Sequence, residues 1–243
     1  MDNAIYATLS RQSGLMNEMR TVANNIANAN TTGFRREGVI FAEHLASLNR
    51  RGDHYGDTLS MAHARGRLTD LRQGVLTQTN GNLDLAIEGE GFFMVDTPDG
   101  PRLTRAGSFL PSPEGELMTA DGHRLLDEGQ APIILPTGAS AVAIGADGTM
   151  SANGLPFGRI GVFAAPDMAG MTRQGGTAFA FRGNPEPVEN PNVRQGFLEE
   201  SNVDPVFEIT RMIEVQRAYE LGQSLLDRED QRIRGAISAM TRQ

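Results

Sequence analysis

The residues that could do acid–base chemistry lie close together in the middle of the chain. Asp84, Glu88 and Glu90 have a spacing that a pair of catalytic carboxylates could use. Leucine and isoleucine residues alternate with them, so Asp84 and Glu88 are expected on the solvent face of a half-buried strand. No nucleophile, base and oxyanion donor accompany them in the pattern of a catalytic site. We therefore predict no catalytic residue and do not expect an enzyme.

Two further patterns could bind a cofactor or a metal ion. The sequence EGEGFF at 88–93 contains glycines typical of a phosphate-binding loop, but it lacks a third glycine, a following helix and a Lys-Ser/Thr ending. His44, His54 and His63 lie in a polar segment without the spacing of a metal site, and the chain contains no cysteine. The sequence therefore predicts no cofactor and no metal.

Side-chain amides are concentrated between residues 24 and 30. Asn24, Asn25, Asn28 and Asn30 crowd this stretch, although asparagine is a mediocre helix former. Amides beside an apolar stripe can form hydrogen bonds between helices or between subunits. The alternative, which the sequence leaves open, is the frayed polar end of a helix.

An apolar repeat precedes these asparagines. Its members step by four and three residues, which is the spacing of a coiled-coil seam rather than of a strand. They are Ile5, Leu9, Gln12, Met16, Met19, Ala23 and Ile26. The pattern predicts a helix that ends near Ala29, because the asparagines, threonines and Gly33 that follow favour a turn.

A second repeat of the same kind lies at the end of the chain. Its positions are Met212, Val215, Tyr219, Gly222, Leu226, Glu229, Ile233, Ala236 and Met240. Asp204 before Pro205 predicts the start of this helix, since a proline in the first turn loses no hydrogen bond. We expect the two helices to pair with each other, although periodicity alone equally allows both to pack on one globular core.

The chain between the two repeats has the pattern of a β protein. From about Leu71 to Phe197, short β-prone pieces alternate with turn sequences. The turns are PDG at 98–100, EG at 114–115, DG at 121–122, DG at 147–148 and NG at 153–154. They predict an antiparallel β domain with Phe179 and Phe181 in its last strand pair. The preceding polar segment is predicted as a glycine-punctuated loop, in which Phe41, Leu45 and Leu48 would fit a short helix.

These elements predict an α+β fold. The N- and C-terminal helices form a coiled-coil layer, and the centre is a mainly antiparallel β domain. We expect residues 1–37 and 201–243 to form a helical polymerisation domain, residues 38–72 a polar connecting segment and residues 73–200 the β domain.

Charge and hydropathy exclude several classes of partner. The net charge is −8 and the pI is near 5.1, and no basic stripe could neutralise phosphates, so no nucleic acid is expected. No apolar run approaches the ~18 residues of a membrane span. The N-terminus also lacks the basic and apolar regions of a cleavable signal peptide. If the protein leaves the cytoplasm, another machine must recognise it.

Three sequence blocks, taken in order, resemble one family. They are ANNIANANTTGF at 23–34, LDLAIEGEGFFMV with LTRAGSF at 83–95 and 103–109, and VRQGFLEESNVDPVFEITRMIEVQRAYE at 193–220. This combination resembles the axial proteins of the bacterial flagellum, the rod and hook subunits. The opening MDNAIY, the modest length and the SNVDPV sequence are most similar to a proximal rod subunit, with a distal rod or hook subunit as the alternative. Gly222 departs from the family pattern, in which this position more often carries a better helix former.

The resemblance implies a structural subunit of the basal-body rod, the hollow drive shaft that transmits torque from motor to hook. The implied partners are further copies, other rod subunits and the flagellar type III export apparatus. Neither nucleic acid nor direct membrane insertion is implied. The subunit would lie in the periplasmic rod after export without signal cleavage. A remote alternative is a secreted β-domain enzyme or carbohydrate-binding module, which would need a concave site with converging polar groups.

We expect residues at both ends of the chain to contact other subunits. They are Ile5, Leu9, Met16, Met19, Ala23, Asn24, Asn25, Ile26, Asn28, Asn30, Gly33, Phe34, Ser201, Asn202, Val203, Met212, Ile213, Gln216, Arg217 and Tyr219.

Overall fold

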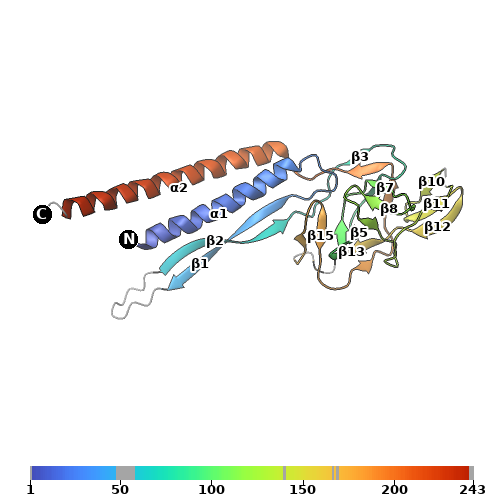
Figure 1. Ribbon diagram of the computed structural model, residues 1–243, viewed down its shortest axis with the longest axis horizontal. Helices are drawn as coiled ribbons and strands as arrows, with labels where there is room; N and C mark the ends of the chain where they lie inside the picture. The colour runs from blue at the N-terminus through green and yellow to red at the C-terminus, as the bar shows by residue number, and fades with distance from the viewer. Residues whose placement is uncertain (1, 48–57, 139–140, 166, 168–169, 241–243) are drawn as a thin grey trace. The chain divides into compact units, whose positions relative to one another are not determined.

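The chain forms two compact units, each built from segments that are far apart in the sequence. The computed structural model describes residues 2–47, 58–138, 141–165, 167 and 170–240 (Figure 1). The first unit comprises Met1–Ala27, Glu37–Asp70 and Val203–Gln243, and the second comprises Asn28–Arg36 and Leu71–Asn202. Helices lie at both ends and antiparallel strands lie between them, so the predicted α+β class is confirmed.

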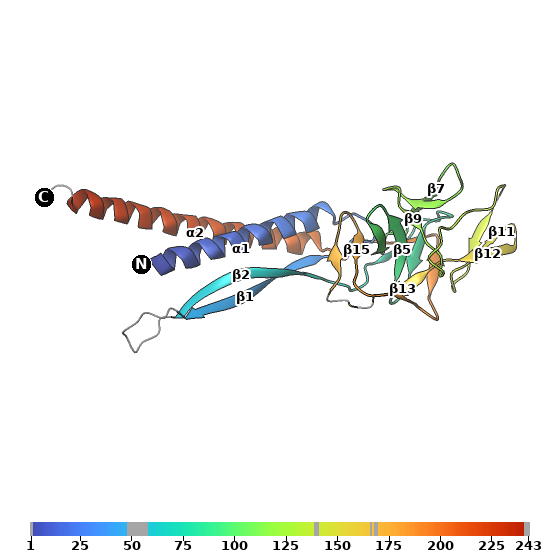
Figure 2. The same ribbon diagram turned by 60° about the horizontal axis from the view of Figure 1, so that its bottom comes forward.

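The first unit consists of two long helices and a β-hairpin. Helix α1 spans Asp2–Ala27 and helix α2 spans Pro205–Met240. The helices run antiparallel, because Gln12 of α1 contacts Tyr219 of α2, whereas the later residue Glu18 contacts the earlier residue Arg211. Strands β1 (Glu37–Ser47) and β2 (Thr58–Thr69) pair with each other and lie alongside α1 (Figures 1 and 2).

The start of α2 is set by local capping, as predicted. The Asp204 carboxylate accepts hydrogen bonds from the backbone N–H groups of Val206 at 2.9 Å and Phe207 at 3.1 Å. Pro205 occupies the first helical position, where an N–H would have no partner within the helix. The sequence alone therefore determines this end of the helix.

The short helix predicted at Phe41 and Leu45 and the loop predicted over the described residues after 57 are wrong, whereas Leu48 and the predicted loop at 49–57 lie outside the described residues. The described parts of this segment form β1 and β2, with a register shift between Ile40 and Phe41. The ladder between the strands satisfies the backbone polar groups, and α1 covers the ribbon, so it needs no strongly periodic apolar sequence of its own. Both conditions depend on distant parts of the chain, which local patterns do not show.

The second unit is a mainly antiparallel β domain. Its largest sheet has nine strands, seven of them in the order β14-β15-β6-β5-β9-β8-β7, with β13 pairing β5 and β16. The strands are β3 Leu76–Gln78, β4 Leu85–Ile87, β5 Phe92–Thr97, β6 Gly100–Thr104, β7 Phe109–Pro111, β8 Leu117–Thr119, β9 Arg124–Leu125, β10 Val142–Ile144, β11 Thr149–Ala152, β12 Leu155–Arg159, β13 Val162–Ala164, β14 Thr172–Arg173, β15 Ala178–Ala180, β16 Glu186–Pro187, β17 Val193–Gln195 and β18 Phe197–Glu199.

All five predicted turns connect consecutive strands. At the β11–β12 turn, Asn153 and Gly154 have φ values of 50° and 84°, which is the left-handed backbone that a tight hairpin requires. The prediction that Phe179 and Phe181 form the last strand pair is wrong, because β16, β17 and β18 follow. Strands β17 and β18 pair with β4 and β3, so these short strands are stabilised by distant partners rather than by their own sequence.

The core of the β domain lies on both faces of β5. Phe93 belongs to one hydrophobic cluster and packs edge-to-face on Phe109, with ring centroids 5.5 Å apart. Its neighbour Phe92 belongs to a second cluster with Phe163 and Phe179. Successive residues of a strand point to opposite faces, so a strand buried on both faces has a continuous apolar sequence.

Candidate functional site

The carboxylates of Asp84 and Glu88 form hydrogen bonds within the β domain. The Asp84 carboxylate accepts a hydrogen bond from the Thr79 hydroxyl at 2.6 Å, and the Glu88 carboxylate accepts one from the Asn192 side chain at 3.0 Å. Within the described ranges, no three histidine, cysteine, aspartate or glutamate side chains are arranged to hold a metal ion. The side chains of His44, His54 and His63 lie outside the described residues.

Helix α1 mainly buries a different face from the predicted seam. Its buried side chains off the seam are Leu15, Glu18, Thr21, Val22 and Asn25. On the predicted seam Gln12 is buried, Leu9 is 50% exposed, and Met16, Met19 and Ile26 are half-buried. Ala23 is exposed, and the side chain of Ile5 lies outside the described residues. Within one chain, the described apolar side chains of the predicted seam are thus exposed or half-buried.

Helix α2 turns its predicted seam toward α1. Val215 is buried, and Met212, Tyr219, Gly222 and Leu226 are half-buried. A Cβ atom on Gly222 would lie 2.8 Å from Nε2 of Gln12, which donates a hydrogen bond to the Tyr219 carbonyl at 3.1 Å. The glycine that departs from the family pattern therefore makes room for a hydrogen bond between the helices.

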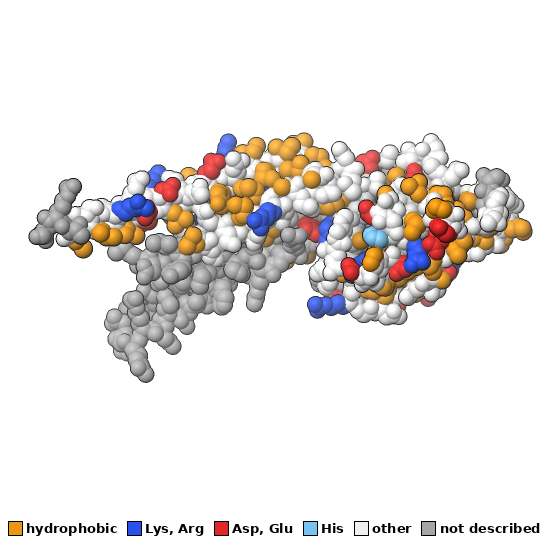
Figure 3. Space-filling view, in the orientation of Figure 1, with side chains coloured by type: hydrophobic (Ala, Val, Ile, Leu, Met, Phe, Trp, Pro, Cys, Tyr) orange, Lys and Arg blue, Asp and Glu red, His pale blue; other side chains and the backbone are white. Residues whose placement is uncertain are grey.

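The opposite side of α2 carries an exposed apolar patch. It consists of Val206, Ile209 and Ile213, which are 74%, 50% and 46% exposed. Apolar side chains are visible on the surface of the first unit in Figure 3. Gln216 and Arg217, which we also expect to contact other subunits, are exposed further along the same helix. Apolar residues on two sides of one helix indicate more than one packing partner.

A buried polar cluster joins α1, β1 and α2. The Asn25 amide donates hydrogen bonds to the Glu37 carbonyl at 2.8 Å and to the Glu208 carboxylate at 3.1 Å, and it accepts one from the Glu37 N–H at 3.0 Å. All three residues are buried. The predicted hydrogen bond between helices is therefore present at Asn25, whereas Asn24 and Asn30 are exposed and Asn28 is half-buried.

An ion pair between Glu18 and Arg211 also connects the helices. The Arg211 Nη2 atom lies 2.5 Å from Oε1 of Glu18, and Arg211 also contacts Glu214. Although burial disfavours the charge of Arg211, its hydrogen bond to Glu18 and the Glu18 charge raise its pKa. We expect Glu18→Gln to lower the free energy of unfolding by no more than about 1 kcal/mol, since the Arg211 side chain is 43% exposed and solvent screens the pair. Urea unfolding followed by circular dichroism checks this value.

The turn after α1 belongs to the second unit and packs closely on its backbone. Gly33 has a φ of 69°, and a Cβ atom on it would lie 2.2 Å from the backbone nitrogen of Ala106. Its N–H donates to the Glu199 carbonyl at 2.7 Å. Phe34 is buried, and the Arg173 guanidinium lies 4.0 Å from its ring centroid. Both residues, predicted to contact other subunits, have internal packing roles.

Gly33→Ala should destabilise the second unit by about 2 kcal/mol or more. Left-handed backbone disfavours a side chain, and the contact with Ala106 is to backbone that cannot move aside. Thermal unfolding of the purified variant measures the effect. Gly89→Ala is a control that separates conformational strain from steric overlap, because its φ is 99° but no atom lies within 4 Å of the added Cβ. Equal losses in both variants would argue against the close packing at Gly33.

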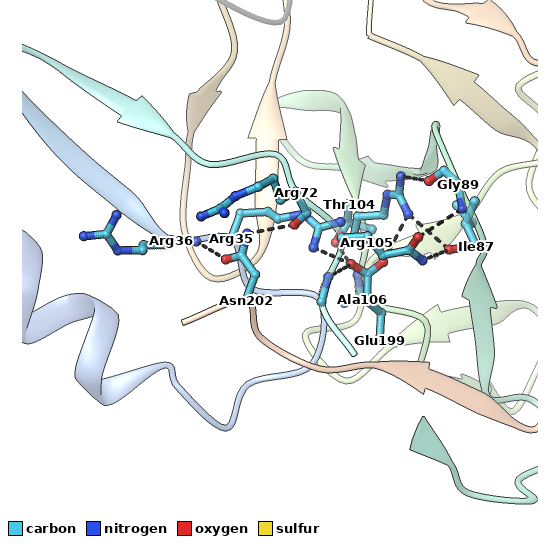
Figure 4. A network of polar contacts seen from close by, with 12 residues as sticks. Arg35, Arg36, Arg72, Ile87, Gly89, Thr104, Arg105, Ala106, Glu199 and Asn202 are labelled. Carbon is cyan, nitrogen blue, oxygen red and sulfur yellow. Dashed lines mark hydrogen bonds and ion pairs between the residues drawn. The ribbon is translucent and has the colours of Figure 1, made fainter. Parts of the chain in front are cut away.

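Asn202 ties together three chain segments of the second unit (Figure 4). Its side chain accepts a hydrogen bond from the Arg36 N–H at 2.6 Å and donates one to the Arg72 carbonyl at 2.8 Å, while its N–H donates to the Phe34 carbonyl at 3.3 Å. Ser201 is half-buried beside it, and Val203 is buried. Asn202 therefore has a role inside the chain in addition to the subunit contact predicted for it.

Two buried arginines share one buried carboxylate next to Asn202 (Figure 4). Arg35 forms an ion pair with Oε1 of Glu199, and Nη1 of Arg105 lies 3.1 Å from Oε2. Arg105 also donates to the carbonyls of Ile87 at 3.2 Å and Gly89 at 2.6 Å. Burial lowers the pKa of Arg105 to about 10 against the opposing attraction of Glu199. Sequence patterns gave no indication of this cluster, since charged residues are ordinarily assigned to solvent.

Three protein families match successive parts of the chain. The family described as flagella basal body rod protein matches residues 5–35, and the D1 domain of the flagellar hook protein FlgE/F/G matches residues 86–152. The C-terminal region of the flagellar basal body rod FlgEFG protein matches residues 194–239. Most of both helices and about half of the β domain are thus matched by one group of proteins.

Similar proteins extend over nearly the whole chain. It is 39% identical over 242 residues to the flagellar basal-body rod protein FlgF of Caulobacter vibrioides, which covers 99% of this chain and 98% of that protein. It is 38% identical over 223 residues to FlgF of Rhizobium meliloti, with 90% of each chain covered. The flagellar basal-body rod protein FlgG of Bacillus subtilis is 30% identical over 254 residues, with 95% of this chain and 96% of that protein covered.

The fold and these matches define the class of protein as an axial component of the bacterial flagellum. The chain belongs to the family of flagellar basal-body rod proteins, and it is similar to the FlgF members. This family is structural, and the distal rod, hook and enzyme alternatives are not favoured. None of the described helices combines the length and the apolar character of a membrane span.

Proposed function

We propose that this chain is a structural subunit of the proximal part of the flagellar rod and polymerises through its two terminal helices. Its partners are further copies and other rod subunits. The helices form a coiled-coil layer. Export through the flagellar type III apparatus without signal cleavage places the subunit in the periplasmic rod. The family membership supports the rod assignment.

The observation that carries the polymerisation proposal is the uncovered apolar surface of the helices. Leu9 and Ile213 are about half exposed, and Leu221 and Leu225 line a hollow of about 290 Å³ together with Leu15 and Ala218. Covering one such side chain stabilises an assembly by about 1.5–3 kcal/mol, whereas ordering each residue costs ~1–2 kcal/mol. A lone pair of helices is therefore marginal, and neighbouring subunits supply the missing contacts.

The chain contains no cysteine, which permits a direct test of these contacts. We expect Ile213→Cys to form dimers in purified basal bodies, linked by a disulfide or a bifunctional thiol reagent, because one thiol per chain can join only two chains. The matched control is the same variant in cells whose export apparatus is disabled, where it should remain monomeric. Dimers that appear equally without export would mean that the contact does not belong to the rod. A second control, Glu114→Cys on the exposed β7–β8 turn, reports non-specific cross-linking.

A further inference from the structure

Glu199 contacts all of the chain segments that lead from the second unit into the first. Its carbonyl accepts from the Gly33 N–H, and its carboxylate forms the ion pair with Arg35 in the same segment. The carboxylate also accepts from the Gly74 N–H at 2.9 Å, in the segment that follows β2. Glu199 itself lies at the end of β18, just before the segment that leads to α2. One side chain thus joins three stretches of chain.

The cluster around Glu199 has one carboxylate for two cations. Glu199, Arg35 and Arg105 are 1%, 0% and 4% exposed. Nε and Nη2 of Arg35 have no hydrogen-bond partner among the described residues. The two guanidinium groups therefore share one ion-pair partner among the described residues, and its loss leaves two buried positive charges with only the more distant charge of Glu90 acting on Arg105.

Asn202 and Arg173 reinforce the same place. Arg173 donates a hydrogen bond to the Arg35 carbonyl, and its guanidinium lies 4.0 Å and 4.9 Å from the ring centroids of Phe34 and Phe179. Together with the bonds of Asn202, these contacts form a clamp that we define as residues 33–36, 72–74, 199, 201 and 202 with Arg105 and Arg173. No clamp residue is a member of either hydrophobic cluster of the β domain. Arg105 and Arg173 lie against the rings of Phe92 and Phe179 in the second cluster, so the protection of a core amide must be measured beside that of the clamp.

We propose that Glu199 is a positioning residue that closes this clamp, so that the segments leading to the helices leave the β domain at fixed points. Torque applied to the helices is then transmitted to the β domain through segments that the clamp keeps in a fixed conformation. The mechanical part of this inference rests on the proposed rod function. The closure of the clamp does not, because it is a property of the single chain.

Amide hydrogen exchange of the purified full chain tests the closure of the clamp. The N–H groups of Gly33, Arg36, Gly74 and Asn202 all donate within the clamp. In Glu199→Gln, which keeps the shape of the side chain but removes its charge, we expect these four amides to exchange at least about tenfold faster. The Leu126 N–H, bonded to the Met94 carbonyl at 2.9 Å in the core, should keep its protection.

Two comparisons make the exchange result decisive. Glu200→Gln changes the exposed residue next to Glu199, whose carboxylate accepts a hydrogen bond from the Thr77 hydroxyl. This variant should leave the exchange rates of the four amides unchanged. Glu199→Asp keeps the charge and should restore part of the protection. Unchanged exchange in Glu199→Gln would overturn the proposal. An equal loss of protection at Leu126 would also overturn it, because Glu199 would then stabilise the whole domain.

The mechanical consequence is tested in cells with beads attached to stalled motors. Rotational fluctuations of the bead report the torsional stiffness of the drive shaft, and we expect Glu199→Gln rods to be about twofold or more softer than wild type, with Glu200→Gln unchanged. Loss of subunits alone would lower the number of rotating motors without lowering the torsional stiffness of the remaining drive shafts. Unaltered stiffness with faster clamp exchange would overturn the torque role. If the chain were absent from the rod, the proposed rod function would be contradicted, whereas the hydrogen-exchange result for the clamp would be unaffected.

Discussion

Leu9→Asp and Ile213→Asp should each abolish rod assembly and swimming, while the purified variant keeps its β domain folded. Both side chains are about half exposed in the single chain, so the new carboxylate costs little there. In a rod built through these faces it would be buried without a partner, which costs several kcal/mol at every subunit contact. Spreading of cells in soft agar measures assembly and function, and thermal unfolding measures the fold of the isolated chain.

Gln223→Asp is the matched control for these variants. It adds the same charge at an exposed polar position of α2, outside the apolar patch and outside the seam. Cells with this variant should swim. Normal swimming with Leu9→Asp or Ile213→Asp would show that the exposed apolar faces are not subunit contacts.

Asn25→Ala should unfold the helical unit of the isolated chain. The substitution removes three buried hydrogen bonds that join α1, β1 and α2, each with a cost of about 1–3 kcal/mol when its partner stays buried. A loss of about 3 kcal/mol or more exceeds what a marginal pair of helices can tolerate. Far-ultraviolet circular dichroism should show a loss of helix with the β signal retained.

Asn24→Ala provides the comparison for Asn25. The two residues are adjacent and chemically identical, but Asn24 is exposed. We expect a change within about 0.5 kcal/mol for this exposed substitution. Equal helix content in the Asn25→Ala variant and the wild type would contradict the role of the buried cluster.

The features that the sequence predicts best are those that depend on neighbouring residues. The cap at Asp204 and Pro205 and the turn at Asn153 and Gly154 are determined by the local backbone, and both lie where predicted. Strand β5, which contains the apolar run from Phe92 to Val95, lies within the stretch predicted as an antiparallel β domain. In each case the residues that carry the pattern also form the structure.

The features that the sequence did not predict depend on distant partners. Strands β1 and β2 need no strong apolar periodicity in their own sequence, because they are stabilised by pairing with each other and by contact with α1. The same hairpin contributes to selecting which stripe of α1 is buried, so Leu15 and Val22 are covered instead of Met16 and Ala23. The sequence of α1 alone does not show which of its two stripes is buried, because the choice depends on the β1–β2 hairpin.

The buried charges belong to the same group of unpredicted features. Arg35 and Glu199 are far apart in the sequence, and nothing in the spacing of either residue indicates its partner. Glu208 lies in the first turn of α2, where the positive end of a helix favours a carboxylate. Its carboxylate, however, is buried against Asn25 rather than exposed to solvent. Such pairs become visible only when the fold is known.

The most direct measurement of the central claim is cryo-electron microscopy of the intact basal body with this chain traced in place. We predict that α1 and α2 form part of the inner wall of the proximal rod, with Leu9 and Ile213 packed against neighbouring subunits. A basal body whose rod lacks this chain would contradict the account. So would one in which the apolar faces of both helices remain exposed to solvent.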